Sequence, residues 1–280
     1  MSVFEQPTLS PVGPPPASAP ASQPLPRSAP APNATLATRV ELTESMAIFG
    51  IVLDSPMIGF KPGQYVSLGL ARDDGLLQRA YSIVALGADG FRVELFIRRV
   101  PDGALSPLLW TLEPGARVRL GPPKGLFVLD ADDPRPRVFI GTGTGLAPLL
   151  AMLGELAARG DGAPNVLIHG VSYRTELAYA ERVESWLGGG LDLWYIPAVS
   201  RPDDSRNSGW TGTTGRADAV LARVLGEDRS LAAGVAYMCG NPSMIEACSA
   251  VLTEGGMAAS DVRSERFHTP AAGAPVLRQM

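Results

Sequence analysis

The sequence predicts two domains in succession: an antiparallel β-barrel, followed by an α/β domain built on a parallel sheet. Short β-like segments bounded by Gly, Pro and Asp turns fill residues 35–133, and strand-like and helix-like segments alternate after Pro136. The 280 residues, 45% of them hydrophobic, suffice for two cores of ordinary size. Charge and proline cluster at residues 132–137, so we expect one domain at 34–133 and the other at 134–268.

The first 33 residues differ from the rest of the chain. They hold ten Pro, five Ala and five Ser, with Glu5 and Arg27 as the only charged residues. Proline removes backbone donors and the segment has little apolar surface to bury, so we expect a disordered tail at 1–33. It lacks the basic start and apolar core of a signal peptide. Residues 269–280 are expected to form a second, C-terminal tail.

The barrel is expected to contain six strands and one helix. The predicted helix covers residues 105–112 and is capped by Ser106 or Asp102. Turns such as Lys61-Pro62-Gly63 separate the strands. The predicted strands are 37–42, 46–53, 64–70, 79–85, 91–97 and 116–120.

The second domain is expected to alternate strand and helix, which implies a parallel sheet with helices on its faces. Apolar residues recur at helical spacing from Leu146 onward, and Gly188-Gly189-Gly190 ends a second helix. The predicted strands are 137–141, 166–170, 191–199 and 235–239. The predicted helices are 146–156, 176–187, 217–225 and a last one that begins near Met244.

Composition excludes several classes of protein. The formal net charge of −4 gives no indication of a nucleic-acid surface. Two cysteines are too few for a disulfide framework or a four-cysteine iron–sulfur cluster, and they favour a reduced, cytoplasmic setting. Both histidines are isolated in sequence, so no metal site is expected. No apolar run approaches the roughly 18–20 residues that a membrane span needs.

Arg79-Ala80-Tyr81-Ser82 lies on a predicted strand. Side chains alternate across a strand, so Arg79 and Tyr81 share one face and Ser82 takes the other. Arginine binds phosphate with a forked pair of hydrogen bonds, and tyrosine offers a stacking face. A serine hydroxyl can both donate and accept a hydrogen bond. The tetrapeptide therefore suits a ligand with a phosphate and a flat ring, although taken alone it fits better an edge strand with a solvated arginine and a half-buried tyrosine.

Two further segments lie where a strand ends and a helix begins. Residues 141–148 form a glycine-rich turn whose helix start favours a pyrophosphate, but its Gly-Thr-Gly-Thr-Gly departs from the Gly-x-Gly-x-x-Gly fingerprint, and a purely structural turn also fits. Residues 239–244 read Cys-Gly-Asn-Pro-Ser-Met, with Asn241 as a candidate cap. Cys239 either faces a ligand beyond the strand end or packs as a small hydrophobe.

The order and spacing of these three segments resemble the ferredoxin–NAD(P)+ reductase family of flavoproteins, over roughly residues 36–267. Arg79-x-Tyr81-Ser82 matches the family's flavin motif, and residues 61–66 and 103–106 match the hallmarks on either side of it. The glycine-rich turn matches Gly-Thr-Gly-x-Gly-x-x-Pro, and residues 239–244 match Cys-Gly-x-Pro-x-Met.

The resemblance implies an FAD site on the barrel. Arg79 and the turn 103–106 would bind the FAD pyrophosphate, Tyr81 would pack on the isoalloxazine, and Ser82 would lie near N5. Phe267 resembles the C-terminal aromatic that covers the other face of the flavin. The residues that the resemblance assigns to FAD are Arg79, Tyr81, Ser82, Phe96, Arg98, Gly103, Leu105, Ser106 and Phe267.

The resemblance also implies a nicotinamide site, with Cys239 beside nicotinamide C4 so that Cys239 and Ser82 are the catalytic pair. Ser200-Arg201 resembles the 2′-phosphate site of NADP-dependent members, although Asp203 and Asp204 and the Arg-Pro pair also resemble NADH-dependent oxygenase reductases. We therefore expect NADP, with NAD as the alternative. The residues assigned to the nucleotide are Gly141, Thr142, Gly143, Thr144, Gly145, Pro148, Arg174, Ser200, Arg201, Arg216, Cys239, Gly240, Asn241, Pro242 and Met244.

The function that the resemblance implies is electron transfer between NAD(P)H and a separate ferredoxin or flavodoxin by way of FAD. One alternative is the reductase component of an oxygenase system that uses NADH. The other is a non-catalytic flavoprotein subunit that relays electrons within a complex.

Overall fold

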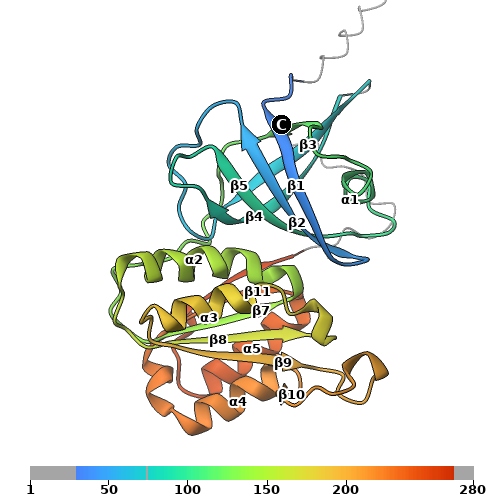
Figure 1. Ribbon diagram of the computed structural model, residues 1–280. Coiled ribbons are helices and arrows are strands. Elements are labelled where there is room, and N and C mark those ends of the chain that lie inside the picture. Colours follow the sequence, from blue (N-terminus) through green and yellow to red (C-terminus); the bar gives the residue numbers. More distant parts are fainter. Residues whose placement is uncertain (1–29, 74, 268–280) are drawn as a thin grey trace, which may run out of the picture.

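The computed structural model describes residues 30–73 and 75–267 and consists of a barrel stacked on an α/β layer (Figure 1). Most of the expected N-terminal tail, and the expected C-terminal tail together with His268, lie outside the described residues.

The barrel contains six antiparallel strands, which are closed in the order β1-β2-β5-β4-β3-β6. Closure leaves no open sheet edge, and side chains such as Phe49, Leu68 and Leu95 fill the interior. Each strand overlaps its predicted segment, and the predicted fold class is confirmed. The strands are β1 (Ala34–Thr43), β2 (Met46–Leu53), β3 (Tyr65–Arg72), β4 (Gly75–Leu86), β5 (Arg92–Arg98) and β6 (Arg117–Leu120).

The helix of the barrel is shorter than predicted, and its predicted cap is wrong. α1 covers only Ser106–Leu109, follows Leu105 and has no side-chain cap. The Ser106 hydroxyl instead accepts a hydrogen bond from the Val100 amide at 2.9 Å. The serine therefore closes the loop before the helix and does not cap the helix itself.

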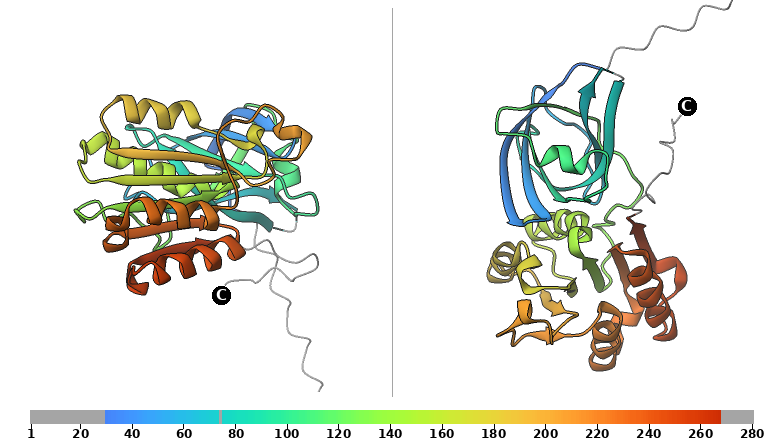
Figure 2. Two further views of the ribbon diagram at one scale, coloured as in Figure 1. Left: turned by 90° about the horizontal axis from the view of Figure 1, so that it is seen from below. Right: turned by 90° about the vertical axis from the view of Figure 1, so that its right-hand side faces the viewer.

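The second domain has a parallel sheet with helices on both faces, as predicted (Figures 1 and 2). Its strand order is β10-β9-β8-β7-β11-β12. α2 and α3 pack on one face, and α4 and α5 on the other. The strands are β7 (Arg137–Thr142), β8 (Asn165–Val171), β9 (Leu193–Val199), β10 (Thr213–Thr214), β11 (Val235–Gly240) and β12 (Val262–Arg266). The helices are α2 (Leu146–Arg159), α3 (Ala180–Gly188), α4 (Ala217–Glu227) and α5 (Pro242–Glu254), with short 3₁₀ turns η1 (Gly143–Gly145), η2 (Arg174–Glu176), η3 (Ser205–Asn207), η4 (Arg229–Ala233) and η5 (Ala259–Asp261).

The predicted start of the second helix, at residue 176, is wrong by four residues. The chain first makes the turn η2, and α3 begins only at Ala180 because Tyr179 adopts the left-handed conformation with φ of 65°. β10 and β12 were not predicted. β10 has two residues, and β12 has the polar sequence Val-Arg-Ser-Glu-Arg, so neither shows an apolar run.

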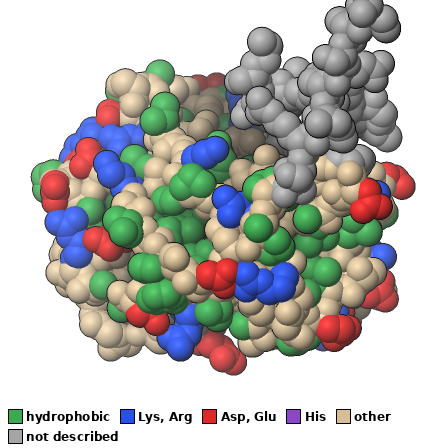
Figure 3. All heavy atoms as spheres, turned by 90° about the horizontal axis from the view of Figure 1, so that it is seen from above, with side chains coloured by type: hydrophobic (Ala, Val, Ile, Leu, Met, Phe, Trp, Pro, Cys, Tyr) green, Lys and Arg blue, Asp and Glu red, His purple; other side chains and the backbone are tan. Residues whose placement is uncertain are grey.

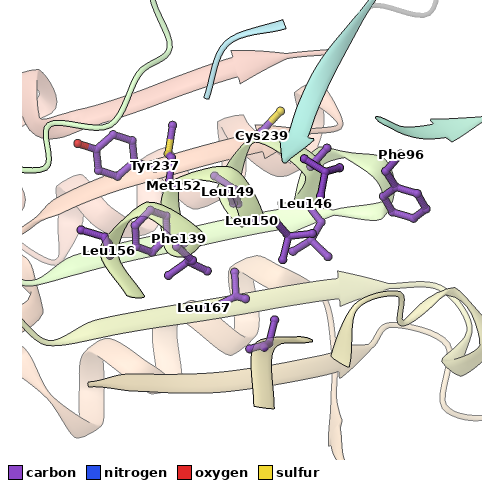
Figure 4. Packing of buried hydrophobic residues seen from close by; sticks show 14 of the residues in the cluster. Phe96, Phe139, Leu146, Leu149, Leu150, Met152, Leu156, Leu167, Tyr237 and Cys239 are labelled. Atoms are coloured by element: carbon purple, nitrogen blue, oxygen red, sulfur yellow. The ribbon is translucent and has the colours of Figure 1, made fainter. Parts of the chain in front are cut away.

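α2 joins the two domains into one core. Its residues pack against Phe139 of β7 and Tyr237 of β11 on one side, and Met46, Val84 and Phe96 of the barrel belong to the same cluster (Figure 4). A helix in contact with apolar partners on opposite sides needs apolar residues around most of its circumference, as α2 has.

The linker between the domains is fixed by hydrogen bonds. The Tyr237 hydroxyl accepts the Asp130 amide at 3.0 Å and the Arg263 guanidinium at 2.9 Å. The fully buried Arg137 donates to Asp161 at 2.8 Å and to the Asp133 carbonyl. These contacts and the shared core hold the barrel against α2, on one face of the parallel sheet (Figure 1).

Candidate functional site between the barrel and the sheet

A cavity of about 1120 Å³ lies where the barrel meets the carboxyl ends of the sheet strands. Cavities for one small ligand are typically about 300–1,000 Å³, so this cavity has room for more than one ring system. Both domains line it, and the sequence segments that carried the resemblance meet here.

Most of the residues predicted from the sequence line this cavity. From the barrel and the C-terminal segment these are Arg79, Tyr81, Ser82, Phe96, Arg98, Gly103, Leu105, Ser106 and Phe267. From the sheet domain they are Thr142, Gly143, Thr144, Ser200, Arg216, Gly240, Asn241, Pro242 and Met244. The predicted residues that do not line it are Gly141, Gly145, Pro148, Arg174, Arg201 and Cys239. Lining residues that were not predicted are Val100, Asp102, Ala104, Gly170, Val171, Ser172, Glu176, Gly215, Ala217, Asp218 and Ser243.

The barrel wall presents side chains from β4. Burial raises the pKa of Tyr81 to about 12, partly offset by the charge of Arg79, so the phenol is neutral. The Arg79 guanidinium donates to the neighbouring Gln78 carbonyl at 2.8 Å. Ser82 is buried and points to the opposite side of the strand, toward β12. An arginine beside a neutral aromatic fits a ligand with a phosphate and a flat ring.

The sheet wall presents backbone. η1 and the start of α2 follow β7, and neither has a side-chain cap, so no side chain competes with a ligand for the amides of this helix start. Gly143 has φ of 54° and lies against the Arg98 guanidinium, while a Cβ at Gly145 would collide with the Cys239 carbonyl. Free amides at a helix start beside a guanidinium fit an anionic pyrophosphate. The residues present therefore fit both a flavin and a nicotinamide dinucleotide.

Cys239 lies one residue behind this wall. Its side chain is fully buried in the core shared by the domains, and the lining begins at Gly240. Burial, with a smaller effect of the Glu265 charge, raises the pKa of the Cys239 thiol well above its usual range. The thiol is therefore neutral and shapes the wall from behind.

Glu265 does not line the cavity but contacts Ser82, which does, and this contact was not predicted from the sequence. The Ser82 hydroxyl donates to its carboxylate at 3.4 Å, which connects the barrel to β12. Burial raises the pKa of Glu265, and the Ser82 hydrogen bond lowers it in part. The only sequence signal is position: Glu265 lies two residues before Phe267, at the end of a polar segment.

A cluster of arginines surrounds Tyr173 beside the cavity. Arg201 and Arg206 each donate to the Tyr173 hydroxyl at 2.6 Å, and the Arg206 guanidinium lies 3.6 Å from the ring centroid. Asp204 binds Arg206 at 2.8 Å, and hydrogen bonds from Arg206 lower the pKa of Asp204 to about 2. Arg206 was not predicted from the sequence.

Within residues 30–73 and 75–267, no three His, Cys, Asp or Glu side chains are grouped so that they could hold a metal ion. His169 is buried in the sheet, where one ring nitrogen contacts the Tyr195 hydroxyl at 3.2 Å. In the same part of the chain, every helix is too short or too polar to cross a bilayer.

Comparison with known proteins agrees with this geometry. Residues 33–129 match the family model of the oxidoreductase FAD-binding domain, and residues 139–250 match that of the oxidoreductase NAD-binding domain. The structure is similar to that of the Amycolatopsis cytochrome P450 reductase GcoB, with a TM-score of 0.74 and 27% identity, covering 84% of this chain and 69% of that one.

Curated proteins with similar sequences include a ferredoxin–NADP reductase and the reductase component of an oxygenase. The ferredoxin–NADP reductase of Pseudomonas aeruginosa is 33% identical over 218 residues, which are 72% of this chain and 82% of that protein. The reductase component DmpP of phenol 2-monooxygenase from Pseudomonas sp. (strain CF600) is 33% identical over 237 residues, 84% of this chain but only 65% of the relative. From the two domain matches, these relatives and the shared cavity, it follows that the chain belongs to the ferredoxin–NAD(P)+ reductase family.

Proposed function

We propose that this protein transfers electrons between NAD(P)H and a separate electron-transfer protein, a ferredoxin or flavodoxin, by way of FAD. One observation carries the proposal: the flavin-type motif of the barrel and the nucleotide-type loops of the sheet line the same cavity. When bound, FAD would supply the redox chemistry that links a two-electron donor to a one-electron acceptor.

The contribution of the chain is to position its ligands. Arg79 and the backbone of residues 103–106 would bind the FAD pyrophosphate, and the Tyr81 ring would lie against the isoalloxazine. The amides of residues 142–144 would bind the pyrophosphate of the nucleotide. Phe267, held by a hydrogen bond from its amide to the Gly240 carbonyl at 3.1 Å, would cover the other flavin face.

Ser82 and Glu265 would move a proton. Because burial raises the pKa of Glu265, its carboxyl group keeps a proton to a higher pH than an exposed glutamate, and Ser82 connects it to the cavity. The rate of any step that needs this proton falls as the pH rises through the raised pKa.

Glu265→Gln is expected to slow a step that needs the Glu265 proton by up to about 10²-fold. It should also flatten the part of the pH–rate profile in which the rate falls with rising pH. Stopped-flow measurement of flavin reduction and reoxidation across the pH range tests the role. A profile identical to that of the wild type would remove Glu265 from the proton path.

For the nucleotide we propose NADPH. The convergence of Arg201 and Arg206 on the Tyr173 hydroxyl supports this choice, because the same donors suit a 2′-phosphate. Asp204 neutralises Arg206 and favours NADH. The test is the ratio of kcat/KM for NADPH to that for NADH, and Arg201→Ala should lower it. A wild-type ratio below one overturns the choice.

The reductase component of an oxygenase system is the second candidate. Relatives such as DmpP carry that description, but this chain spans 65% of that protein's length. The two cysteines of this sequence are too few to hold a four-cysteine iron–sulfur cluster. On the barrel-side face, basic and acidic side chains are interspersed, so local contacts would select the partner (Figure 3).

The free thiols Cys239 and Cys248 support a reducing, cytoplasmic setting.

Spectroscopy tests the proposal. The purified protein should be yellow and should bleach when NADPH or NADH is added without oxygen; a protein that stays colourless after incubation with FAD would contradict it. Candidate ferredoxins, flavodoxins and oxygenase components, offered one at a time to the reduced protein, then identify the acceptor. Reduction of an oxygenase component but of no ferredoxin or flavodoxin would favour the second candidate.

A further inference from the structure

Three outward-facing residues of β5 contact three residues of the stretch 176–182, which runs from η2 into the first turn of α3. Glu94, Phe96 and Arg98 point away from the barrel interior, which Val93, Leu95 and Ile97 fill. Each contacts a residue of the sheet domain: Arg98 pairs with Glu176, Phe96 makes an edge contact with Tyr179 at 5.5 Å, and Glu94 pairs with Arg182. The contact therefore has an aromatic centre between two ion pairs.

The two ion pairs differ in location. Arg182 binds both oxygens of Glu94, at 2.7 and 3.1 Å, and neither residue lines the cavity. Arg98 binds Glu176 through a single contact of 3.3 Å, and both of these residues line the cavity. The chain thus offers one ion pair between the domains inside the cofactor site and one outside it.

Glu176 also determines the shape of the loop after β8. Its second carboxylate oxygen accepts the amides of Ser172 at 3.0 Å and Tyr173 at 3.2 Å, and its side chain is only 10% exposed. Ser172 lines the cavity. One carboxylate therefore ties a loop on the nucleotide side to the Arg98 guanidinium on the flavin side.

The strained backbone at Tyr179 indicates that contact with the barrel keeps the segment before α3 in its observed conformation. Tyr179 has φ of 65°, an unfavourable conformation for a bulky side chain. Its ring lies between Phe96 and the Arg182 guanidinium, which is 4.8 Å from the ring centroid. Of these two contacts, the one with Phe96 is present only while the barrel is in place.

We propose that Glu176 is a positioning residue for electron transfer: through Arg98 it fixes the nucleotide loop 172–176 relative to the flavin side of the cavity. The inference rests on the proposed function. It predicts that the loss of this one charge slows flavin reduction without releasing FAD, because misplacement of a reacting group by about 1 Å can cost about 10²-fold in rate.

The principal test is Glu176→Gln in the FAD-loaded full chain. The amide oxygen can still accept the Ser172 and Tyr173 amides, but the attraction to Arg98 is lost. We expect the limiting rate of flavin reduction by the better nucleotide to fall about tenfold or more. Arg98→Lys should retain more of this rate than Arg98→Met. The matched control is Glu94→Gln, which breaks the ion pair outside the cavity and should change the rate by less than about twofold.

Hydrogen–deuterium exchange gives a readout that does not depend on turnover. Arg98 reaches the Ser172 and Tyr173 amides through Glu176, so Arg98→Met should speed their exchange, whereas Glu94→Gln should not. A wild-type reduction rate in Glu176→Gln together with wild-type exchange in Arg98→Met would overturn the inference, as would equal slowing by Glu94→Gln. If the wild-type protein itself is not reduced by NAD(P)H, the proposed function fails instead, and the exchange experiment still decides whether Arg98 holds the loop.

Discussion

The two walls of the cavity are built from different parts of the polypeptide. The barrel wall uses side chains that alternate along a rigid strand, with Arg79 and Tyr81 on one face of β4 and Ser82 on the other. The sheet wall uses backbone at strand ends, where Gly143 and Gly240 line the cavity and adopt positive φ. The flavin-type motif lies on the barrel wall, and the nucleotide-type loops lie on the sheet wall. Changes to the barrel wall should therefore affect FAD retention, and changes to the sheet wall should affect the nucleotide.

The largest expected effect is on the barrel wall. Arg79→Ala removes a charged phosphate contact and should weaken FAD retention by about 1.5–3 kcal/mol. Dialysis followed by flavin absorbance measures this loss. Arg92→Ala is the matched control, because Arg92 lies on the same barrel in an exposed pair with Asp89. Full occupancy of FAD in dilute Arg79→Ala protein would show that the barrel side chains are not what retains the flavin.

On the sheet wall, Gly145→Ala should destabilise the protein by about 1–3 kcal/mol, because its Cβ would force the start of α2 away from the Cys239 carbonyl. Nucleotide binding should weaken while FAD stays bound. Gly226→Ala is the control: no atom lies within 4 Å of its Cβ, so it should stabilise α4 by about 0.5–1 kcal/mol. Thermal unfolding measures the change in stability of each variant, and nucleotide titration measures the change in its affinity for the nucleotide. Loss of FAD from Gly145→Ala would contradict the division between the walls.

Cys239→Ala tests a side chain behind the sheet wall. Because the thiol is buried and neutral, we expect slower flavin reduction, by about tenfold through misplacement of the wall, with FAD still bound. Cys248→Ala, in the core on the other sheet face, is the control for loss of volume. Equal rates of hydride transfer in Cys239→Ala and wild type would leave Cys239 as a core residue alone.

The smallest effect is that of pH on stability. Burial lowers the pKa of His169 to about 4, from 6.5 in the unfolded chain, so the unfolded state binds the additional proton between these values. Stability is therefore complete above pH 6.5 and is lost as the pH falls, by about 0.8 kcal/mol at pH 6. Denaturant unfolding of wild type and His169→Gln at pH 8 and 6 measures this; equal losses in both would exclude His169.

The sequence predicted the features whose residues are close together in the chain and missed contacts between residues that are far apart. Arg79, Tyr81 and Ser82 are contiguous, and the alternation of strand and helix after Pro136 is continuous, so the fold class and most of the lining could be predicted. Glu265 is 183 residues from Ser82, and Glu176 is 78 residues from Arg98, so only the folded chain reveals either contact. The start of α3 depends on a left-handed tyrosine that packing against the barrel holds in place, and no helix propensity encodes that conformation.

The position of α2 has a consequence for any attempt to cut the protein into parts. Leu146, Leu150 and Met152 belong to a helix with apolar neighbours in both domains, so neither half contains all of its own interior. A fragment beginning at Arg137 would expose the barrel-facing apolar side of α2 to water and should self-associate. A fragment ending before Arg137 would expose the apolar barrel residues that α2 covers in the full chain. The two domains must therefore stay in one polypeptide to bury their shared core, whether or not catalysis also needs them together.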